Sequence, residues 1–341
     1  MNAVRVHAPV RVLDAGGWTD TWFARRGAVC HLAVADGIHV SARRSTLRGS
    51  AEVASAELDV PNLGERYGYP IDQPPGRHPL LETAVRRFCP PACNVHVTVS
   101  SSVPPACGVG TSASVLVALI AALTALAGDI SGGGWDAEAL ARAAHHVETV
   151  DLGLQSGVQD HVAAAYGGGN FLTIDSYPHV NVHHLDMASS TWEALTGRTI
   201  TVYLGRPHHS SSVHEAVIQR LASTDAETCL APLRAAAHHA ATALLEGNID
   251  AYGQALIANT RAQAALHPAL VNPVAREVIR VAAGHGALGW KVNGAGGEGG
   301  TVTIVGPDRP DELATAVSSI AGVTLLPLRP AREGVRVVDH D

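Results

Sequence analysis

The sequence contains few aromatic residues and no run of basic residues. Only 4% of its 341 residues are aromatic, and its net charge is −7. A nucleic-acid partner or an anionic membrane surface is therefore not indicated. The first residues lack the charged segment followed by an apolar one that typifies a signal peptide. The longest apolar run, Val115–Ala127, is too short to span a bilayer and predicts a buried helix.

Cysteine is also scarce. The chain has five cysteines, an odd number for its length, which favours reduced thiols and a cytoplasmic location. Cys89 and Cys93 lie close together, but no second Cys/His pair has zinc-type spacing. Many of the nineteen histidines form doublets, which we interpret as surface or helix-face residues, with His208-His209 as the exception.

The length and the 46% hydrophobic content predict two domains, residues 1–195 and 196–341, with a boundary near 190–198. Alternation and apolar periodicity predict a mixed α+β order. In the first part we expect strands at 3–13, 28–42, 51–58, 94–100 and 170–174, further strand-like pieces to about 185, helices at 80–88, 115–127, 136–150 and 158–166, and an irregular loop at 59–79. In the second part we expect strands at 199–204, 289–292, 301–305, 323–327 and 335–339, and helices at 211–222, 228–246, 249–265, 273–285 and 310–320.

A glycine-punctuated loop at residues 104–114, PPACGVGTSAS, runs directly into the long apolar helix. Backbone N–H groups at such a helix start can converge on phosphate oxygens, and the helix dipole adds a favourable field. The loop lacks the GxxxxGK[ST] pattern of a Walker A motif. A plain strand-to-helix turn is the alternative interpretation of this segment alone.

Two further glycine-rich segments, 14–20 and 293–300, stand far from this loop, and each lies between a strand and another element. Four motifs along the chain make it resemble the GHMP kinase superfamily of small-molecule kinases. They are APVR (8–11) followed by AGGWTD (15–20), the loop at 104–114, E…G…SGVQD (148–160) and K…GAGG…G (291–300). The resemblance covers nearly the whole chain and is greatest for the sugar-kinase branch. AGGWTDT is similar to L-fucokinase, and GVQDHVAAAYGGGNF is similar to D-glycero-D-manno-heptose 7-phosphate kinase.

The resemblance implies a two-domain GHMP-kinase-like fold, with a ribosomal-S5-like N-terminal domain, a ferredoxin-like C-terminal domain and an active site between them. It also implies ATP and Mg²⁺ as cofactors. The ATP phosphates would lie on one stretch of the 104–114 loop: Pro105, Cys107, Gly108, Val109, Gly110, Thr111, Ser112, Ala113 and Ser114.

Asp160 and Arg11 are the predicted catalytic residues. Transfer of a phosphoryl group to a hydroxyl needs a group that takes the hydroxyl proton, and the resemblance assigns this role to Asp160. Arg11 would hold Asp160 ionised or contact the transferring group. The alternatives are an Asp that caps a helix and an exposed arginine at a strand end.

Glu148 and Ser112 are the predicted Mg²⁺ ligands by resemblance. One carboxylate and one hydroxyl fit the usual Mg²⁺ site, which keeps several waters and takes its other oxygens from phosphates. The alternative for Glu148 is a solvated charge on a helix.

Substrate recognition is predicted at Gly17, Trp18, Thr19, Asp20, Gly157, His208 and Gly296. An Asp can accept hydrogen bonds from two vicinal hydroxyls, and an indole can cover an apolar sugar face. A half-buried turn aromatic is the alternative for Trp18. His208 stands where heptose-phosphate kinases have an arginine, which weakens that substrate assignment unless Arg206 substitutes. Glu298 departs from the family's small residue and is expected to point away from the phosphates, and Cys107 is expected to be a spectator.

The sequence thus predicts an ATP- and Mg²⁺-dependent kinase that phosphorylates a hydroxyl of a small-molecule sugar or sugar phosphate, such as a heptose phosphate or a fucose-like sugar. The anomeric C1 hydroxyl is the expected acceptor. A non-catalytic sugar- and ATP-binding regulator on the same fold is the alternative. A decarboxylase-type relative is disfavoured by the AGGWTD segment. A homodimer is left open.

Overall fold

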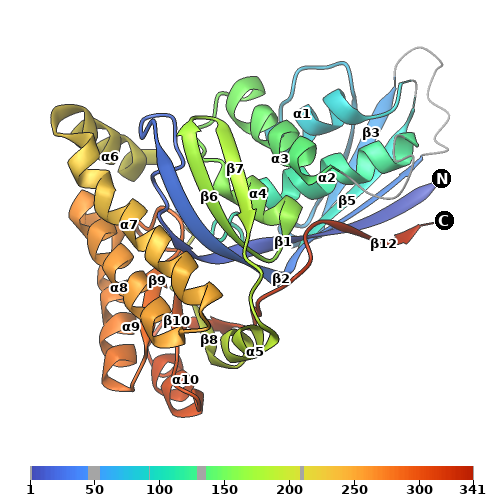
Figure 1. Ribbon diagram of the computed structural model, residues 1–341. Coiled ribbons are helices and arrows are strands. Elements are labelled where there is room, and N and C mark those ends of the chain that lie inside the picture. The colour runs from blue at the N-terminus through green and yellow to red at the C-terminus, as the bar shows by residue number, and fades with distance from the viewer. Residues whose placement is uncertain (1, 45–53, 92, 129–135, 208–210, 341) are drawn as a thin grey trace.

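The computed structural model describes residues 2–44, 54–91, 93–128, 136–207 and 211–340. They form an α+β structure in which two sheets carry helices (Figure 1). Most of the predicted helices and strands are confirmed to within a few residues at their ends.

The first sheet has the strand order β12-β1-β2-β5-β3-β4, and β2 also pairs with β6, which pairs with β7. Its strands are β1 (Ala3–Ala15), β2 (Gly27–Arg44), β3 (Ser55–Val60), β4 (Glu65–Pro70), β5 (Val95–Ser101), β6 (Gly169–Ser176), β7 (His179–His184) and β12 (Arg336–His340). Because β12 pairs with β1, the two ends of the chain lie side by side in Figure 1. Residues 336–340, which the domain prediction groups with the second unit, therefore belong to the first sheet.

Helices α1–α4 pack with the first sheet: α1 (Pro79–Phe88), α2 (Thr111–Ala127), α3 (Ala137–His146) and α4 (Gln159–Tyr166). The predicted burial of α2 is confirmed, since Leu116, Leu119 and Leu123 are fully buried. A helix that is apolar on all sides is stable only when other elements surround it. The sheet, α1, α3 and α4 fulfil that requirement and fix the loop that precedes α2.

The second unit is built on a four-stranded sheet of order β11-β8-β10-β9. Its strands are β8 (Thr199–Tyr203), β9 (Gly289–Val292), β10 (Thr301–Val305) and β11 (Thr324–Leu326), and its helices are α5 (Ser189–Arg198), α6 (Ser211–Ser223), α7 (Ala226–Leu245), α8 (Ile249–Leu266), α9 (Pro273–Gly284) and α10 (Asp311–Ser318). One apolar cluster joins β1 and β2 of the first unit to α7 and α8 of the second. This shared core fixes the relative position of the two walls of the cleft described below.

Two expectations about local structure were wrong. The predicted irregular loop at 59–79 contains a 3₁₀ turn, Pro61–Leu63, and strand β4. Tyr67 and Tyr69 lie two residues apart, so both side chains pack on the apolar core while their neighbours face away. Helix α5 was not predicted at all, because only Trp192 and Leu195 give it a buried apolar face.

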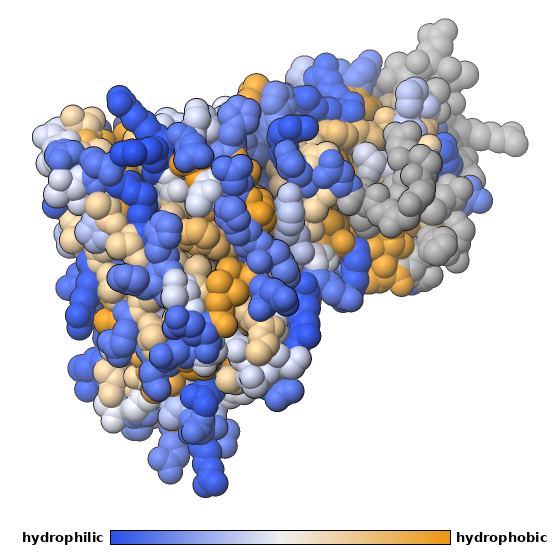
Figure 2. All heavy atoms as spheres, in the orientation of Figure 1, coloured by the Kyte–Doolittle hydropathy of each residue, from blue (hydrophilic) through white to orange (hydrophobic). Residues whose placement is uncertain are grey.

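Hydrophobic residues form small, separate groups on the face of the molecule shown in Figure 2, among many hydrophilic side chains. Among the described residues, every helix falls short of the length and apolar character that a membrane crossing needs.

Candidate active site

A cavity of about 740 Å³ lies between the two units. The lining residues come from five parts of the chain, four of which were singled out from the sequence. These lining residues are Arg11, Asp14, Gly17, Trp18, Asp20, Thr21, Trp22, Phe23, Ala106, Gly108, Gly110, Thr111, Ser112, Glu148, Gly153, Leu154, Gln155, Ser156, Gly157, Gln159, Asp160, His214, Glu215, Gly294 and Ala295.

Arg11 joins the predicted base to the predicted phosphate loop. Its Nε donates to Oδ1 of Asp160 at 2.7 Å, and its Nη1 donates to the carbonyl of Gly108 at 2.6 Å. Burial opposes the charge on Arg11, but Asp14 and Asp160 more than offset it and raise the pKa of the guanidinium. Arg11 is 3% exposed, so the alternative of an exposed strand-end arginine is wrong.

The phosphate loop needs glycine where it passes the base. Gly110 precedes α2 with φ +78°, and a Cβ there would lie 3.1 Å from Cγ of Asp160. A Cβ on Gly294 would lie 2.8 Å from the carbonyl of Gly108, so the third glycine segment approaches the loop closely. The N-terminus of α2 has no side-chain cap, which leaves its first N–H groups available to an anion.

Glu148 lies on a π-helical turn, Val147–Asp151, that follows α3. Its Oε2 is 2.9 Å from Nε2 of His161, without the alignment of a hydrogen bond, so we treat the pair as a charge contact. Burial raises the pKa of Glu148, but His161 and the hydroxyls of Ser112 and Ser156 outweigh it and lower the pKa to about 2. At 6% exposure, Glu148 is not the solvated helix charge that was the alternative.

Glu148 and Ser112 thus lie together at the cavity. This donor set fits Mg²⁺, which binds one or two protein oxygens and completes its shell with phosphates and water. The described residues contain no group of three His, Cys, Asp or Glu side chains that could hold a metal ion.

Asp20 and Trp18 also line the cavity. Asp20 is 2% exposed, and burial together with the charge of Asp160 raises its pKa to about 6, although it accepts a hydrogen bond from the N–H of Gln159. The indole of Trp18 is 7% exposed and meets the ring of His214 edge-on at 4.9 Å. Burial lowers the pKa of His214.

Lys291, the single lysine of the chain, ties the third glycine segment to the first. Its Nζ is 3.6 Å from Oδ2 of Asp14, and burial lowers its pKa to about 8 against the opposing effect of Asp14. Asp14 Oδ1 also accepts from the N–H of Gly294 at 3.2 Å. Asn293 adds a second tie, because its Oδ1 accepts from the N–H of Leu13 at 3.0 Å.

Several predicted site residues lie close to the cavity without lining it. The hydroxyl of Thr19 is buried and donates to the carbonyl of Gly16 at 2.7 Å, and that of Ser114 donates to the carbonyl of Pro9 at 2.7 Å. These hydroxyls hold the backbone of their loops in place. The others outside the lining are Pro105, Cys107, Val109, Ala113 and Gly296. His208 lies outside the described residues, Arg206 does not line the cavity, and Glu298 is exposed and away from it, as expected.

Several lining residues were not assigned to the site from the sequence, among them Asp14, Trp22, Gln159, His214 and Glu215. Asp14 could have been predicted as a site residue, because it is a carboxylate among apolar strand residues just before two glycines. Gln159 lies beside Asp160 in a motif that was already noted. His214 and Glu215 reach the cavity from α6, and nothing in that helical segment distinguishes them.

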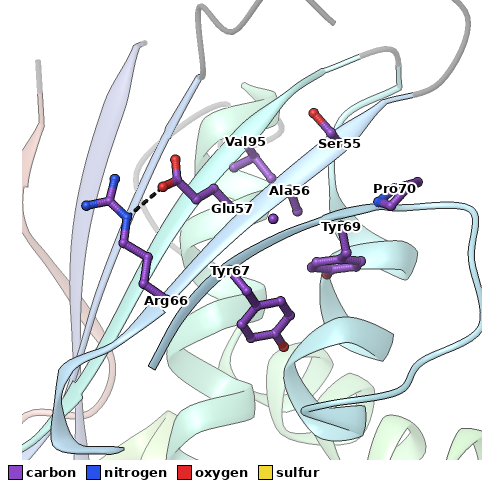
Figure 3. Close-up of a pocket in the computed structure, with 9 residues that line it drawn as sticks. Ser55, Ala56, Glu57, Arg66, Tyr67, Tyr69, Pro70 and Val95 are labelled. Atoms are coloured by element: carbon purple, nitrogen blue, oxygen red, sulfur yellow. Dashed lines mark hydrogen bonds and ion pairs between the residues drawn. The ribbon is translucent and has the colours of Figure 1, made fainter. Parts of the chain in front are cut away.

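A second hollow, of about 630 Å³, lies on the strands β3, β4 and β5. In Figure 3, Arg66 and Glu57 point to one side of the hairpin, and Tyr67 and Tyr69 point to the other. Arg66 Nε donates to Glu57 at 2.6 Å, so the cation and the carboxylate neutralise each other. The hollow contains none of the predicted site residues, and the cavity between the two units remains the candidate site.

Comparison with known proteins identifies relatives along most of the chain. Residues 79–168 match the family model of the GHMP kinases N terminal domain. D-glycero-alpha-D-manno-heptose 7-phosphate kinase of Campylobacter jejuni is 22% identical over 94% of this chain and 95% of its own. Mevalonate kinase of Thermococcus onnurineus is 29% identical over 71% of this chain and 69% of its own.

The fold has solved counterparts. The crystal structure of a D-glycero-D-manno-heptose 1-phosphate kinase from Bacteriodes thetaiotaomicron superposes with a TM-score of 0.73, at 20% identity, over 99% of both chains. At this identity the likeness shows a shared α+β fold. The identity of the acceptor must be argued from the site.

Proposed function

The chain carries a GHMP kinase N-terminal domain over residues 79–168, and we propose that it is an ATP- and Mg²⁺-dependent kinase that phosphorylates a hydroxyl of a sugar or sugar phosphate. The observation that carries the proposal is the 2.7 Å contact between Arg11 Nε and Asp160 Oδ1, beside the glycine loop that opens α2. It brings a carboxylate, a cation and an anion-binding helix start to one cavity.

Asp160 takes the proton of the acceptor hydroxyl. As the hydroxyl oxygen bonds to the γ-phosphorus of ATP, the bond from that phosphorus to the β–γ bridging oxygen breaks and ADP leaves. Asp160 is 25% exposed at its side chain, so the acceptor can reach it from the cavity. Arg11 holds Asp160 against the phosphate loop.

Glu148 and Ser112 are the residues that would hold Mg²⁺. The ion would offset the negative charge on the phosphate oxygens. His161, 1% exposed, lies 2.9 Å from Oε2 of Glu148 and holds this carboxylate in place.

The relatives act on two different classes of acceptor. Heptose phosphate kinases and mevalonate kinases both resemble this chain, and the heptose 7-phosphate kinase does so over 94% of it. Asp20 and Trp18 on the cavity wall favour the sugar class, because a carboxylate can accept from two hydroxyls and an indole can cover an apolar ring face. The anomeric hydroxyl of such a sugar is the proposed site of transfer.

An ADP-release screen tests the proposal, with L-fucose, D-mannose, D-galactose, uronic acids and heptose 7-phosphates as acceptors. Asp160→Asn should lower kcat by roughly 10²–10⁴-fold, because it removes the proton acceptor, and should leave the ATP affinity within a few-fold. Near-wild-type turnover by Asp160→Asn would refute the assigned base. Saturable sugar binding without turnover of any hydroxyl compound would favour the regulator.

A further inference from the structure

Three polar groups on residues that line the cavity are buried and have no hydrogen-bond partner among the described residues. They are Oδ2 of Asp14, Nε1 of Trp18 and Oε1 of Gln159. Their residues are 0%, 7% and 6% exposed, and all three line the cavity. A buried polar group without a partner is costly in free energy, so three in one wall indicate a ligand that supplies the missing partners.

Gly17 lies between two of these side chains, in a narrow space that we call the notch. A Cβ on Gly17 would lie 2.9 Å from Oδ2 of Asp14 and 3.2 Å from Nε2 of Gln159. The two groups are therefore no more than about 6 Å apart, a separation that one hydroxyl oxygen can bridge with two hydrogen bonds. Any side chain at position 17 would occupy the space between them.

The two oxygens of Asp14 have separate surroundings. Oδ1 accepts from the N–H of Gly294 at 3.2 Å and lies 3.4 Å from Nη1 of Arg11. Oδ2 is 3.6 Å from Nζ of Lys291, which donates instead to Gln263 Oε1 at 2.9 Å. Oδ1 thus holds the glycine segments together, while Oδ2 keeps its capacity to accept a hydrogen bond.

The chemistry of the three groups matches hydroxyls. A hydroxyl both donates and accepts, so it can give its proton to Asp14 Oδ2 or Gln159 Oε1 and receive one from the Trp18 indole. A carboxylate or phosphate can only accept, and in the notch it would face the negative charge of Asp14 with Asp20 nearby in the same wall.

We propose that Asp14, Trp18 and Gln159 form a subsite that recognises a hydroxyl-bearing, uncharged face of the acceptor. This inference rests on the proposed kinase function and narrows its acceptor. Any anionic group that the acceptor carries lies outside the notch, and an acceptor of the mevalonate class, whose carboxylate would meet the Asp14 carboxylate there, is disfavoured.

The test compares acceptor kinetics of the full-length protein with ATP and Mg²⁺ at saturation. The acceptors are L-fucose, D-mannose, D-galactose, heptose 7-phosphate and mevalonate. Asp14→Asn, Gly17→Ala and Gln159→Met should each raise the KM of the best acceptor by about tenfold to a hundredfold, since each loses or blocks a hydrogen bond to a buried polar group. The KM for ATP should stay within about twofold. Asp186→Asn, an exposed Asp-to-Asn change away from the cavity, is the matched control.

A series of monodeoxy analogues of that acceptor locates the contact. One monodeoxy analogue should bind the wild-type protein more weakly than the parent acceptor does. Gly17→Ala should not weaken the binding of that analogue any further, because the substitution and the missing hydroxyl remove the same hydrogen bond. In Gly17→Ala the close contacts of the new methyl group are with the ends of two side chains, so we expect this variant to fold. It therefore still tests the subsite if Asp14→Asn does not fold.

Three results would overturn the subsite: an unchanged acceptor KM in the variants that fold, a parallel rise in the KM for ATP, or mevalonate as the best acceptor. Wild-type protein that phosphorylates none of the compounds would instead overturn the proposed function, and the inference with it.

Discussion

Asp20→Asn should stabilise the folded protein at neutral pH while weakening acceptor binding. The carboxyl of Asp20 is buried and has its pKa raised from 3.8 to about 6. The folded state therefore binds a proton more tightly than the unfolded state does, and ionisation of Asp20 favours unfolding. Sites that bind ligands commonly trade stability for function in this way.

The sign and size of the effect follow from linkage. Below pH 3.8 both states carry the proton, so Asp20 costs nothing. Stability falls as the pH rises from 3.8 to about 6, and the cost is constant above that range. Two pKa units correspond to about 3 kcal/mol at pH 8, and the same relation gives about half of that at pH 5. The asparagine oxygen can still accept from the N–H of Gln159, which is 3.0 Å from Asp20 Oδ2.

Urea unfolding of both proteins, without ligand, at pH 5 and pH 8 measures this gain. The unfolding midpoint of Asp20→Asn should exceed that of the wild type at pH 8, and the excess should shrink to about half at pH 5. Asp186→Asn, an exposed change, should stay within about 0.5 kcal/mol of the wild type at both pH values. A variant that is less stable than the wild type at pH 8, or a gain that is equal at both pH values, would show that burial of the Asp20 charge is not costly.

Three further predictions concern the other walls of the cavity. Glu148→Gln should weaken Mn²⁺ binding in the presence of ADP, measured by electron paramagnetic resonance, at least tenfold; unchanged binding would exclude Glu148 as a ligand. Gly110→Ala should lower stability by about 1–3 kcal/mol in urea unfolding, because φ is +78° there and Asp160 is adjacent; a loss below 0.5 kcal/mol would show that the loop relaxes. Cys107 is 0% exposed with its pKa raised by burial, so in timed iodoacetamide labelling it should react after the half-buried Cys229, and faster labelling of Cys107 would contradict the buried loop.

Helices and strands could be predicted from the sequence where the pattern of apolar residues indicates which faces are buried. The run Val115–Ala127 has no polar face, and it forms the fully enclosed part of α2. Strands β1 and β5 alternate, and they hold central or near-central places in the first sheet. A pattern of this kind depends on burial alone, which is why it can be read without knowing the neighbours.

Elements whose stability comes from a few contacts could not be predicted. Strand β4 depends on Tyr67 and Tyr69 packing on a core that the flanking Pro and Gly residues conceal in sequence. The π-helical turn at Val147–Asp151 depends on tertiary packing, and it is this turn that places Glu148 against His161. Local propensity carries no information on either feature.

In the candidate site, too, some residues could be found from a sequence motif, and others have a role that depends on tertiary contacts. The glycine segments and Asp160 were found because their residue types are required at those places by backbone geometry and charge. Asp14 and Gln159 were missed because their role depends on where their side chains meet, across a separation of 145 residues in the chain.

Asp14 also explains why three distant glycine segments can act as one site. A single buried carboxylate contacts Arg11 from the first segment, and Lys291 and the N–H of Gly294 from the third, while Arg11 reaches the carbonyl of Gly108 in the second. An unpaired charge left in such a buried group would be strongly destabilising, so the segments are held together by mutual neutralisation. Asp14 is also one of the residues that line the cavity, so the proposed subsite would use a group that the fold already requires.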